Sequence, residues 1–285
     1  MVMWAKNGAR FLPIVLKRID EVIPHEDVAS RILVDDKSID NTREIARSFG
    51  WTVYDNPTGF VSGGTNTALS HVKMPFFVSV EQDVILARDW WDRIPPYMDD
   101  ETVAVSQGIR LATHPIIRDL EPLSQDRLNR QIKNQVPDYY WSIDNNIFRT
   151  KVIREVGGFP RFEPLAVDYF LLKRIQAKTK YRWIVDPRVV SDHIRTSLIE
   201  YFRHDENFIR LTTKSQYDAS EAVPLSKMMR ITATSPLRGL GLAIRKGDPM
   251  LSAVYPFYRL MYLKAYFLRR RQALERAALS REVSY

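Results

Sequence analysis

Val34-Asp35-Asp36-Lys37-Ser38-Ile39-Asp40-Asn41-Thr42 is the stretch of sequence that decides the fold class. The apolar run at residues 31–34 reads as a buried strand, and residues 42–49 have the spacing of a helix that Gly50 stops. Asp40 is a capping residue for that helix. A strand that passes directly into a helix is half of a βαβ unit, so the stretch predicts an α/β fold.

The same alternation continues on both sides of this stretch. Four further short apolar runs, at residues 2–5, 51–54, 76–80 and 103–109, have the composition of buried strands. Helical spacing occurs at residues 12–23, and again at residues 61–70 after a turn at Gly59. The pattern predicts a Rossmann-like, mostly parallel sheet flanked by helices, which binds ligands at the carboxyl ends of its strands.

Polar and acidic residues follow three of the predicted strands. Lys6-Asn7 follows the first, Asp35-Asp36 the second and Glu81-Gln82-Asp83 the fourth. Helix capping and solvated turns are the plain alternatives. Carboxylates gathered on one rim repel one another unless a cation or a ligand rich in hydrogen-bond donors joins them. The pattern therefore favours a ligand site on this rim.

In their order along the chain, the motifs of residues 1–195 resemble those of the family-2 glycosyltransferases of GT-A fold. The matching segments are Lys6-Asn7, the stretch 34–42, residues 59–66, Glu81-Gln82-Asp83, Gly157-Gly158-Phe159, Asp168 and His193. Two positions depart from the family pattern: Glu81 stands where the family has the first Asp of Asp-x-Asp, and Val167 stands where a Glu is usual.

The resemblance implies transfer of one sugar, with inversion, from a nucleotide-diphosphate sugar to a hydroxyl acceptor. A divalent cation, Mn²⁺ or Mg²⁺, would neutralise the charge that develops on the leaving diphosphate. It places Asp83 and His193 at the metal; a hydrogen-bonding role at a strand end is the alternative for His193. The donor nucleotide would contact Lys6, Asn7, Asp35, Asp36, Glu81 and Gln82.

The acceptor half of the site has its own candidates. Asp168 opens a helical pattern, where it would complement the helix dipole, and the resemblance makes it the catalytic base. Trp141 would offer a face to a sugar ring or pack in the core, and Asp144 would contact sugar hydroxyls or order a loop. The chain lacks the Gln-x-x-Arg-Trp motif of processive synthases, which favours transfer of a single sugar.

The last third of the chain carries the whole net charge of +8. Residues 1–194 hold 26 Lys+Arg and 26 Asp+Glu, whereas residues 195–285 hold 16 and 8. From Pro256 onward, apolar residues form one helical arc and tyrosines and arginines the other. We predict a catalytic domain at residues 1–195 and a helical, basic, amphipathic extension at 196–285. The extension would bind an anionic membrane surface or pack on the catalytic domain; nothing indicates nucleic-acid binding.

The amino-acid composition excludes several kinds of catalytic and metal site and bears on where the protein acts. The chain has no cysteine, which excludes thiolate metal sites, disulfides and a cysteine nucleophile. The basic first residues and the lack of a long apolar run predict a cytoplasmic protein, peripheral on the membrane. The expected acceptor is a lipid-linked or membrane-proximal glycan. The alternatives are sugar transfer to a polyprenyl phosphate, a sugar-phosphate nucleotidyltransferase, and an inactive membrane- or glycan-binding protein.

Overall fold

The computed structural model describes residues 1–120, 141–161, 167–203, 225–264 and 267 of the 285-residue chain. They belong to two compact units, which are considered separately. The first unit comprises residues 1–113 and 125–195, and the second comprises 114–124 and 196–285. Of the described residues, 114–120 group with the second unit.

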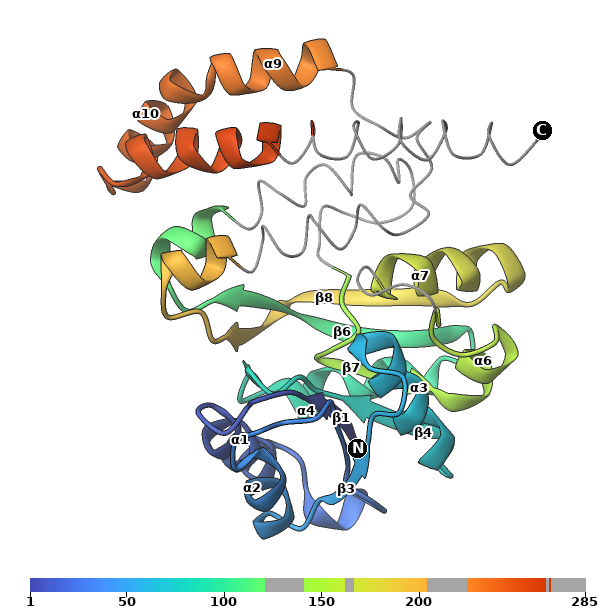
Figure 1. Cartoon of the computed structure of the whole chain (residues 1–285). Coiled ribbons are helices and arrows are strands. Elements are labelled where there is room, and N and C mark those ends of the chain that lie inside the picture. The colour runs from blue at the N-terminus through green and yellow to red at the C-terminus, as the bar shows by residue number, and fades with distance from the viewer. Residues whose placement is uncertain (121–140, 162–166, 204–224, 265–266, 268–285) are drawn as a thin grey trace, which may run out of the picture. The chain divides into compact units, whose positions relative to one another are not determined.

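An eight-stranded sheet forms the centre of the first unit, with the strand order β3-β2-β1-β4-β7-β6-β8-β5 (Figure 1). The strands are β1 (Val2–Ala5), β2 (Ile32–Asp35), β3 (Thr52–Asp55), β4 (Phe76–Ser79), β5 (Val84–Ile85), β6 (Val103–Ala112), β7 (Asn146–Arg149) and β8 (Arg182–His193). Strands β1 to β4 pair in parallel, as do β6 and β8, whereas β7 and β5 pair antiparallel. The predicted α/β class with a mostly parallel sheet is confirmed.

Each of the five predicted strands is present, with ends shifted by up to three residues. The predicted helices are α1 (Leu12–Val22), α2 (Thr42–Ser48) and α3 (Phe60–His71). The other α-helices among the described residues of this unit are α4 (Trp90–Arg93), α6 (Thr150–Glu155) and α7 (Val167–Lys178). Gly59 has a φ of 72°, as its predicted turn requires. Agreement is close because short apolar runs act locally. The predicted cap of α2 is wrong: the N-cap position is Asn41, which makes no side-chain cap hydrogen bond, and Asp40, one residue earlier, accepts from Thr42 N at 3.1 Å.

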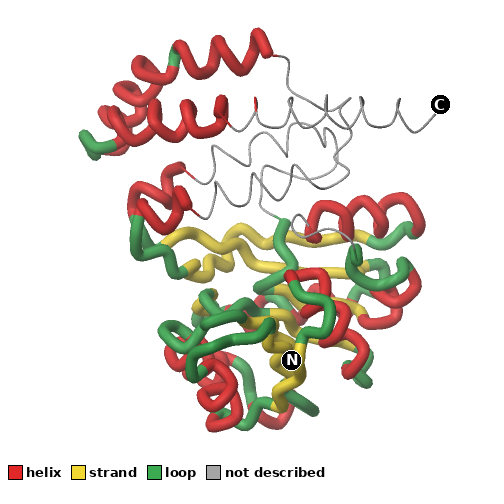
Figure 2. The backbone as a smooth tube through the Cα atoms, viewed as in Figure 1, coloured by secondary structure: helices red, strands yellow, loops and turns green. Residues whose placement is uncertain are grey.

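Both faces of the sheet are buried under helices. Alternate residues of β1 point to opposite faces, so Val2 and Trp4 pack with α3, α6 and α7, whereas Met3 and Ala5 pack with α1, α2 and α4. Figure 2 shows the strands in yellow and these helices in red. Two apolar layers therefore fix the sheet and leave its carboxyl edge for polar side chains.

The long strand β8 ends at His193, as the family resemblance implies, and it brings the two halves of the site together. Its last residue, His193, pairs with Val84 of β5 on one side and Ala112 of β6 on the other. Val84 directly follows Glu81-Gln82-Asp83 in the turn after β4. This pairing places the end of β8 beside the predicted acidic rim.

In its described residues, the second unit is helical. It contains α9 (Leu225–Ala233), α10 (Ser235–Lys246) and helical segments at residues 115–120, 198–203 and 251–264. Gly239 lets α10 approach the segment 251–264, because a Cβ there would lie 3.0 Å from Pro256 Cδ and Ser252 O. Among the helices that the structure describes, none is both long and apolar enough to cross a membrane.

The predicted apolar arc after Pro256 lies on the exposed side of its helix. Phe257 and Leu260 are each 56% exposed, whereas Tyr258 and Arg259 on the other arc are buried. The Arg259 side chain donates to the Tyr255 hydroxyl at 3.1 Å. The tyrosines and the arginine pack inward because their hydroxyl and guanidinium groups satisfy one another.

Candidate metal and donor site

Three side chains meet at the carboxyl edge of the sheet with the chemistry of a metal site. Glu81 and Asp83 come from the turn after β4, and His193 comes from the end of β8. One oxygen or nitrogen atom of each residue lies within 4.8 Å of the others. Two carboxylates and an imidazole suit a Mn²⁺- or Mg²⁺-type cation, so the residues fit the predicted metal.

Arg110 of β6 lies among these groups. Its Nη1 donates to His193 Nε2 at 2.8 Å and lies 3.4 Å from Glu81 Oε2. Its Nε lies 3.3 Å from Asp144 Oδ1. Arg110 thus contacts Glu81 and His193 of the three residues, together with Asp144, and supplies part of the positive charge that the carboxylates require.

Arg195, two residues beyond β8, contacts the remaining carboxylate. Its Nη1 donates to Asp83 Oδ2 at 2.6 Å, and His193 Nε2 is 3.6 Å from the same oxygen. Burial opposes ionisation of Asp83, but His193 and Arg195 outweigh burial and hold its pKa well below the ordinary value. Burial also lowers the pKa of His193 to about 3.

The structure places Asp144 in this cluster rather than in a separate acceptor loop. The Asp144 side chain is 1% exposed and accepts from Ser142 Oγ at 3.1 Å. Burial and then the negative charge of Asp144 raise the pKa of Glu81 well above its ordinary value. When Glu81, Asp83 and Asp144 are all ionised, the cluster with Arg110 and Arg195 carries one net negative charge, which a bound cation would balance. A cation is therefore favoured there.

The predicted donor residues Lys6 and Asn7 lie in a loop that is tied to the stretch 34–42. Asn7 has a φ of 51°, its backbone N–H donates to Ser38 Oγ at 2.8 Å, and its Oδ1 accepts from Ile39 N at 2.9 Å. Asp40 Oδ2 accepts from Ala9 N at 3.1 Å. These bonds hold the ends of β1 and β2 together as one rigid rim.

The two acids after β2 have different environments. Asp35 is buried and accepts from Ser38 N at 3.1 Å and from Arg43 Nη1 at 3.2 Å. Asp36 pairs with Lys6 Nζ at 3.1 Å, and its side chain is 19% exposed. Asp35 therefore shapes the loop, whereas Asp36 and Lys6 present charged groups on the open side of the rim.

Gln82 joins the two parts of the rim. Its Oε1 accepts from Lys6 N at 2.9 Å, and its Nε2 donates to Lys6 O at 3.1 Å. A Cβ at Gly8 would lie 2.5 Å from that Oε1 atom. The glycine thus permits the contact that sets the first loop beside Glu81 and Asp83.

The other two residues predicted for the acceptor half of the site are Trp141 and Asp168. Trp141 is 7% exposed within the hydrophobic core, which agrees with the packing alternative for this side chain. Asp168 is half-buried in the first turn of α7. Phe162 and Leu165, which the sequence suggests as neighbours of Asp168, lie outside the described residues.

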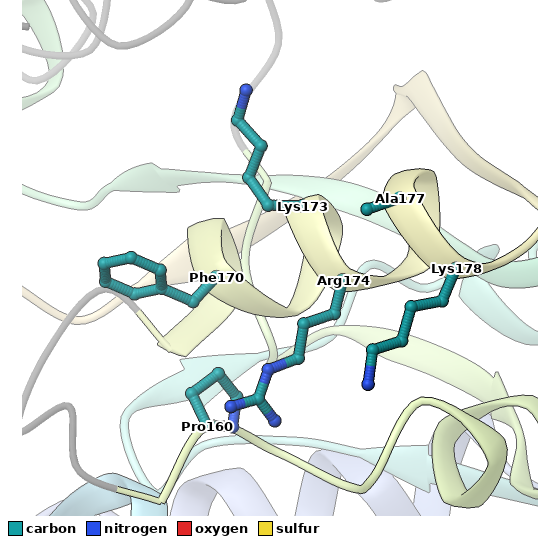
Figure 3. Close-up of a pocket in the computed structure, with 6 residues that line it drawn as sticks. All are labelled: Pro160, Phe170, Lys173, Arg174, Ala177 and Lys178. Atoms are coloured by element: carbon teal, nitrogen blue, oxygen red, sulfur yellow. The ribbon is translucent and has the colours of Figure 1, made fainter.

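A shallow basic pocket lies against α7, lined by Pro160, Phe170, Lys173, Arg174, Ala177 and Lys178 (Figure 3). Arg174 and Lys178 point to the same side of the helix in Figure 3, and they donate to Gly158 O at 3.4 Å and Val156 O at 3.5 Å. They therefore neutralise carbonyls at the end of α6. The pocket contains no predicted site residue, and we do not assign the active site to it.

The Gly157-Gly158-Phe159 motif explains this ending of α6. The φ angles of Gly157 and Gly158 are 91° and 75°, and a Cβ on Gly158 would lie 2.7 Å from Asn66 Oδ1. Asn66 of α3 accepts from Phe159 N and donates to Phe159 O. The motif stops α6 and fastens it to α3.

The sheet and the acid–histidine cluster at its carboxyl edge define the GT-A class of fold. A family model gives the more specific assignment. The model described as glycosyl transferase family 2 matches residues 2–157, and the chain belongs to that family.

A curated relative and two solved structures resemble this chain. The O-antigen chain rhamnosyltransferase WbaN of Salmonella anatum is 29% identical over an alignment of length 191 that covers 61% of this chain and 59% of the relative. The chain thus spans less than two thirds of that relative's length.

The mannosyltransferase PcManGT of Pyrobaculum calidifontis, solved with GDP-Man and Mn²⁺, has a TM-score of 0.59 at 18% identity, over 94% of this chain and 84% of that one. Glucosyl-3-phosphoglycerate synthase of Mycobacterium tuberculosis, solved with Mn²⁺, UDP and phosphoglyceric acid, has a TM-score of 0.54 at 15% identity, over 74% and 76%. At 18% and 15% identity, these structural similarities support the fold assignment and nothing more specific.

Arg110 and Arg195 were not predicted from the sequence. Both positions carry a signal in retrospect, because Arg110 is near the end of a predicted strand and Arg195 is two residues after His193. An acidic rim in a neutral domain needs positive partners from other strand ends. Which arginines supply them depends on the pairing of β6 with β8.

Proposed function

We propose that this protein transfers a single sugar, with inversion, from a nucleotide-diphosphate sugar to a hydroxyl group of a membrane-proximal glycan. The observation that carries the proposal is the convergence of Glu81, Asp83 and His193 at the carboxyl edge of a GT-A sheet. Membership of glycosyl transferase family 2 supplies the reaction class.

The metal would be held by Asp83 and His193, with Glu81 beside them. A bound divalent cation would neutralise charge on the diphosphate oxygens as the bond to the sugar breaks. Both solved relatives hold Mn²⁺ with a nucleotide or nucleotide sugar, which supports Mn²⁺ or Mg²⁺ here. The buried, neutral imidazole of His193 has the protonation state that a ligand needs.

The donor nucleotide would lie over the rim that β1 and β2 form. Lys6 and Asp36 present a cation and an acceptor on its open side. Asn7, Asp35 and Gln82 would act through the loop bonds that keep this rim rigid. A preformed rim lowers the ordering cost of binding a flexible nucleotide.

Asp168 would take the proton of the acceptor hydroxyl as its oxygen attacks the anomeric carbon from the face opposite the diphosphate. The attacking oxygen, carbon and leaving diphosphate then lie in line, which inverts the anomeric configuration. Transfer to a polyprenyl phosphate is the competing possibility, because a phosphate is already ionised and needs no base. The similarity to an O-antigen chain rhamnosyltransferase favours a growing, lipid-linked glycan as acceptor.

The second unit would hold the enzyme on an anionic membrane surface at the cytoplasmic face. Leu237, Leu240 and Ile244 of α10 follow one another at helical spacing and are 76%, 52% and 75% exposed. The exposed Arg238 and Arg245 flank them. Apolar side chains bordered by cations match a bilayer with anionic headgroups, and residues 195–285 contain the whole excess of positive charge.

Release of nucleoside diphosphate from a panel of UDP-, GDP- and dTDP-sugars, with and without EDTA, tests the proposal. Metal-dependent release with one donor, stimulated by a glycan acceptor, is the expected result. Release of pyrophosphate from a nucleoside triphosphate and a sugar phosphate would instead identify a nucleotidyltransferase. Binding of glycan or membrane with no turnover of any donor would identify an inactive binding protein.

A further inference from the structure

The atoms that would hold a metal are already occupied by guanidinium groups. Arg195 Nη1 is 2.6 Å from Asp83 Oδ2, and Arg110 Nη1 is 2.8 Å from His193 Nε2 and 3.4 Å from Glu81 Oε2. A divalent cation binds such an oxygen at about 2.1 Å. It would then face a guanidinium at hydrogen-bond distance from the same oxygen, and the like charges would repel.

The two arginines differ in how easily their side chains can leave. Arg110 lies within the β6–β8 pairing, where it is aligned with Ser191, and it contacts Glu81, Asp144 and His193 together. Arg195 lies in the loop after β8, and its side chain contacts one carboxylate, Asp83, and the carbonyl of Ile194. Arg110 is therefore held by more contacts than Arg195, and Arg195 is the side chain whose departure frees Asp83 at the smaller loss of contacts.

The backbone of Arg195 is held by hydrogen bonds in which its side chain takes no part. Its N–H donates to Thr113 Oγ1 at 3.0 Å, and its carbonyl accepts from the same hydroxyl at 3.1 Å. The Arg195 side chain is 21% exposed. Rotation of the side chain alone would free Asp83 without disturbing the sheet.

We propose that Arg195 neutralises Asp83 until the metal arrives and then transfers to the diphosphate of the donor, so that metal and donor bind cooperatively. The inference rests on the proposed function, because it needs a cation at Asp83 and a diphosphate beside it. A displaced guanidinium needs a new anion, and phosphate oxygens match its planar fork of donors. Without the donor, the Arg195 guanidinium competes with the metal for Asp83 and lowers the affinity for the metal. When the donor binds, its diphosphate accepts the guanidinium and this competition ends.

Mn²⁺ binding without nucleotide, followed through the electron paramagnetic resonance signal of free Mn²⁺, tests the first half. Arg195→Gln removes the charge, so the variant is expected to bind Mn²⁺ about tenfold more tightly than the wild type. Arg182→Gln is the matched control, because it also removes an arginine of the β8 region that pairs with an aspartate, Asp100. The control is expected to bind Mn²⁺ as the wild type does.

The affinity for UDP and GDP at saturating Mn²⁺, measured by calorimetry, tests the second half. The nucleotide that the wild type binds is expected to bind Arg195→Gln about tenfold more weakly, because the diphosphate loses its guanidinium partner. Arg195→Lys keeps the charge without the planar fork, so its nucleotide affinity is expected to lie between those of the wild type and Arg195→Gln. Thermal unfolding of each variant confirms that it is folded before binding is compared.

Several outcomes would overturn the inference. Equal Mn²⁺ affinity of the wild type and Arg195→Gln would mean that Arg195 does not compete with the metal, and the proposed function would stand. Unchanged nucleotide affinity in Arg195→Gln would exclude the transfer to the diphosphate. Failure of the wild type and of Arg195→Gln to bind Mn²⁺ would remove the proposed metal site as well.

Discussion

In the first unit, Arg110 and Arg195 lie among carboxylates, and each side chain is less than a quarter exposed. In the second unit, Arg238 and Arg245 of α10 are exposed and lie near exposed leucines of the same helix. Arginine thus has a largely buried, anionic environment in the first unit and an exposed, apolar one in the second. A buried guanidinium requires a specific anion within hydrogen-bond distance. An exposed one on an amphipathic helix suits any anionic surface and is weakened by salt.

The comparison indicates how each unit recognises a ligand. The site of the first unit depends on individual atoms, so single, nearly isosteric substitutions are expected to have large effects. The face of the second unit depends on summed apolar area and charge, so its substitutions are expected to have graded effects.

Asp83→Asn is expected to cause the largest loss. It removes the charge to which metal and Arg195 bind, so transfer should fall by about 10³-fold or more, with a midpoint of thermal unfolding close to that of the wild type. Nucleoside diphosphate release measures it. Asp192→Asn is the control, because Asp192 is exposed one residue before His193. Full turnover in Asp83→Asn would remove this carboxylate from the site.

Asp168→Asn tests the base. The substitution keeps shape and removes basicity, so transfer to a hydroxyl acceptor should fall by about 10²-fold, while donor affinity stays unchanged. Rates at saturating donor and calorimetric donor binding separate the two effects. Transfer within a few-fold of the wild type would mean that Asp168 only complements the dipole of α7 or that the acceptor is a phosphate.

Leu237→Glu combined with Ile244→Glu tests the face on α10. Co-sedimentation with vesicles containing phosphatidylserine should weaken by about tenfold or more, because two exposed apolar side chains become anionic. Ile39→Glu is the control, since Ile39 is 93% exposed in the first unit. Salt should weaken wild-type binding. A wild type that ignores such vesicles at low salt would exclude the proposed surface.

Asp186→Asn is expected to have the smallest effect, on stability alone. Hydrogen bonds from Arg188 and Tyr97 lower the pKa of Asp186 to about 2 although burial opposes this. A carboxyl whose folded pKa is below its unfolded value stabilises the fold above about pH 4, and that contribution disappears as the pH falls toward 2. Urea unfolding should show the variant less stable by about 1 kcal/mol at pH 7. A difference that does not shrink between pH 4 and pH 2 would contradict this explanation.

Much of the fold could be predicted because its signals are local. The runs that became β1, β2, β3, β4 and β6 are short and apolar, and the stretch 34–42 carries its own turn residues. Asp40 shows one such local bond, since its Oδ1 accepts from the backbone N–H of Thr42, two residues further along the chain. The pattern also indicated where acids would gather, because the carboxyl ends of parallel strands share an edge.

The sequence by itself determined the α/β class, the acidic rim and the location of the positive excess, because each follows from residues close together in the chain. Only the tertiary structure decided which groups balance that rim. Arg195 meets Asp83 across 112 positions of sequence, and Asp144 meets Arg110 because β7 and β8 both pair with β6. Strand pairing between distant segments depends on the packing of the whole sheet, so no local pattern of residues specifies these contacts.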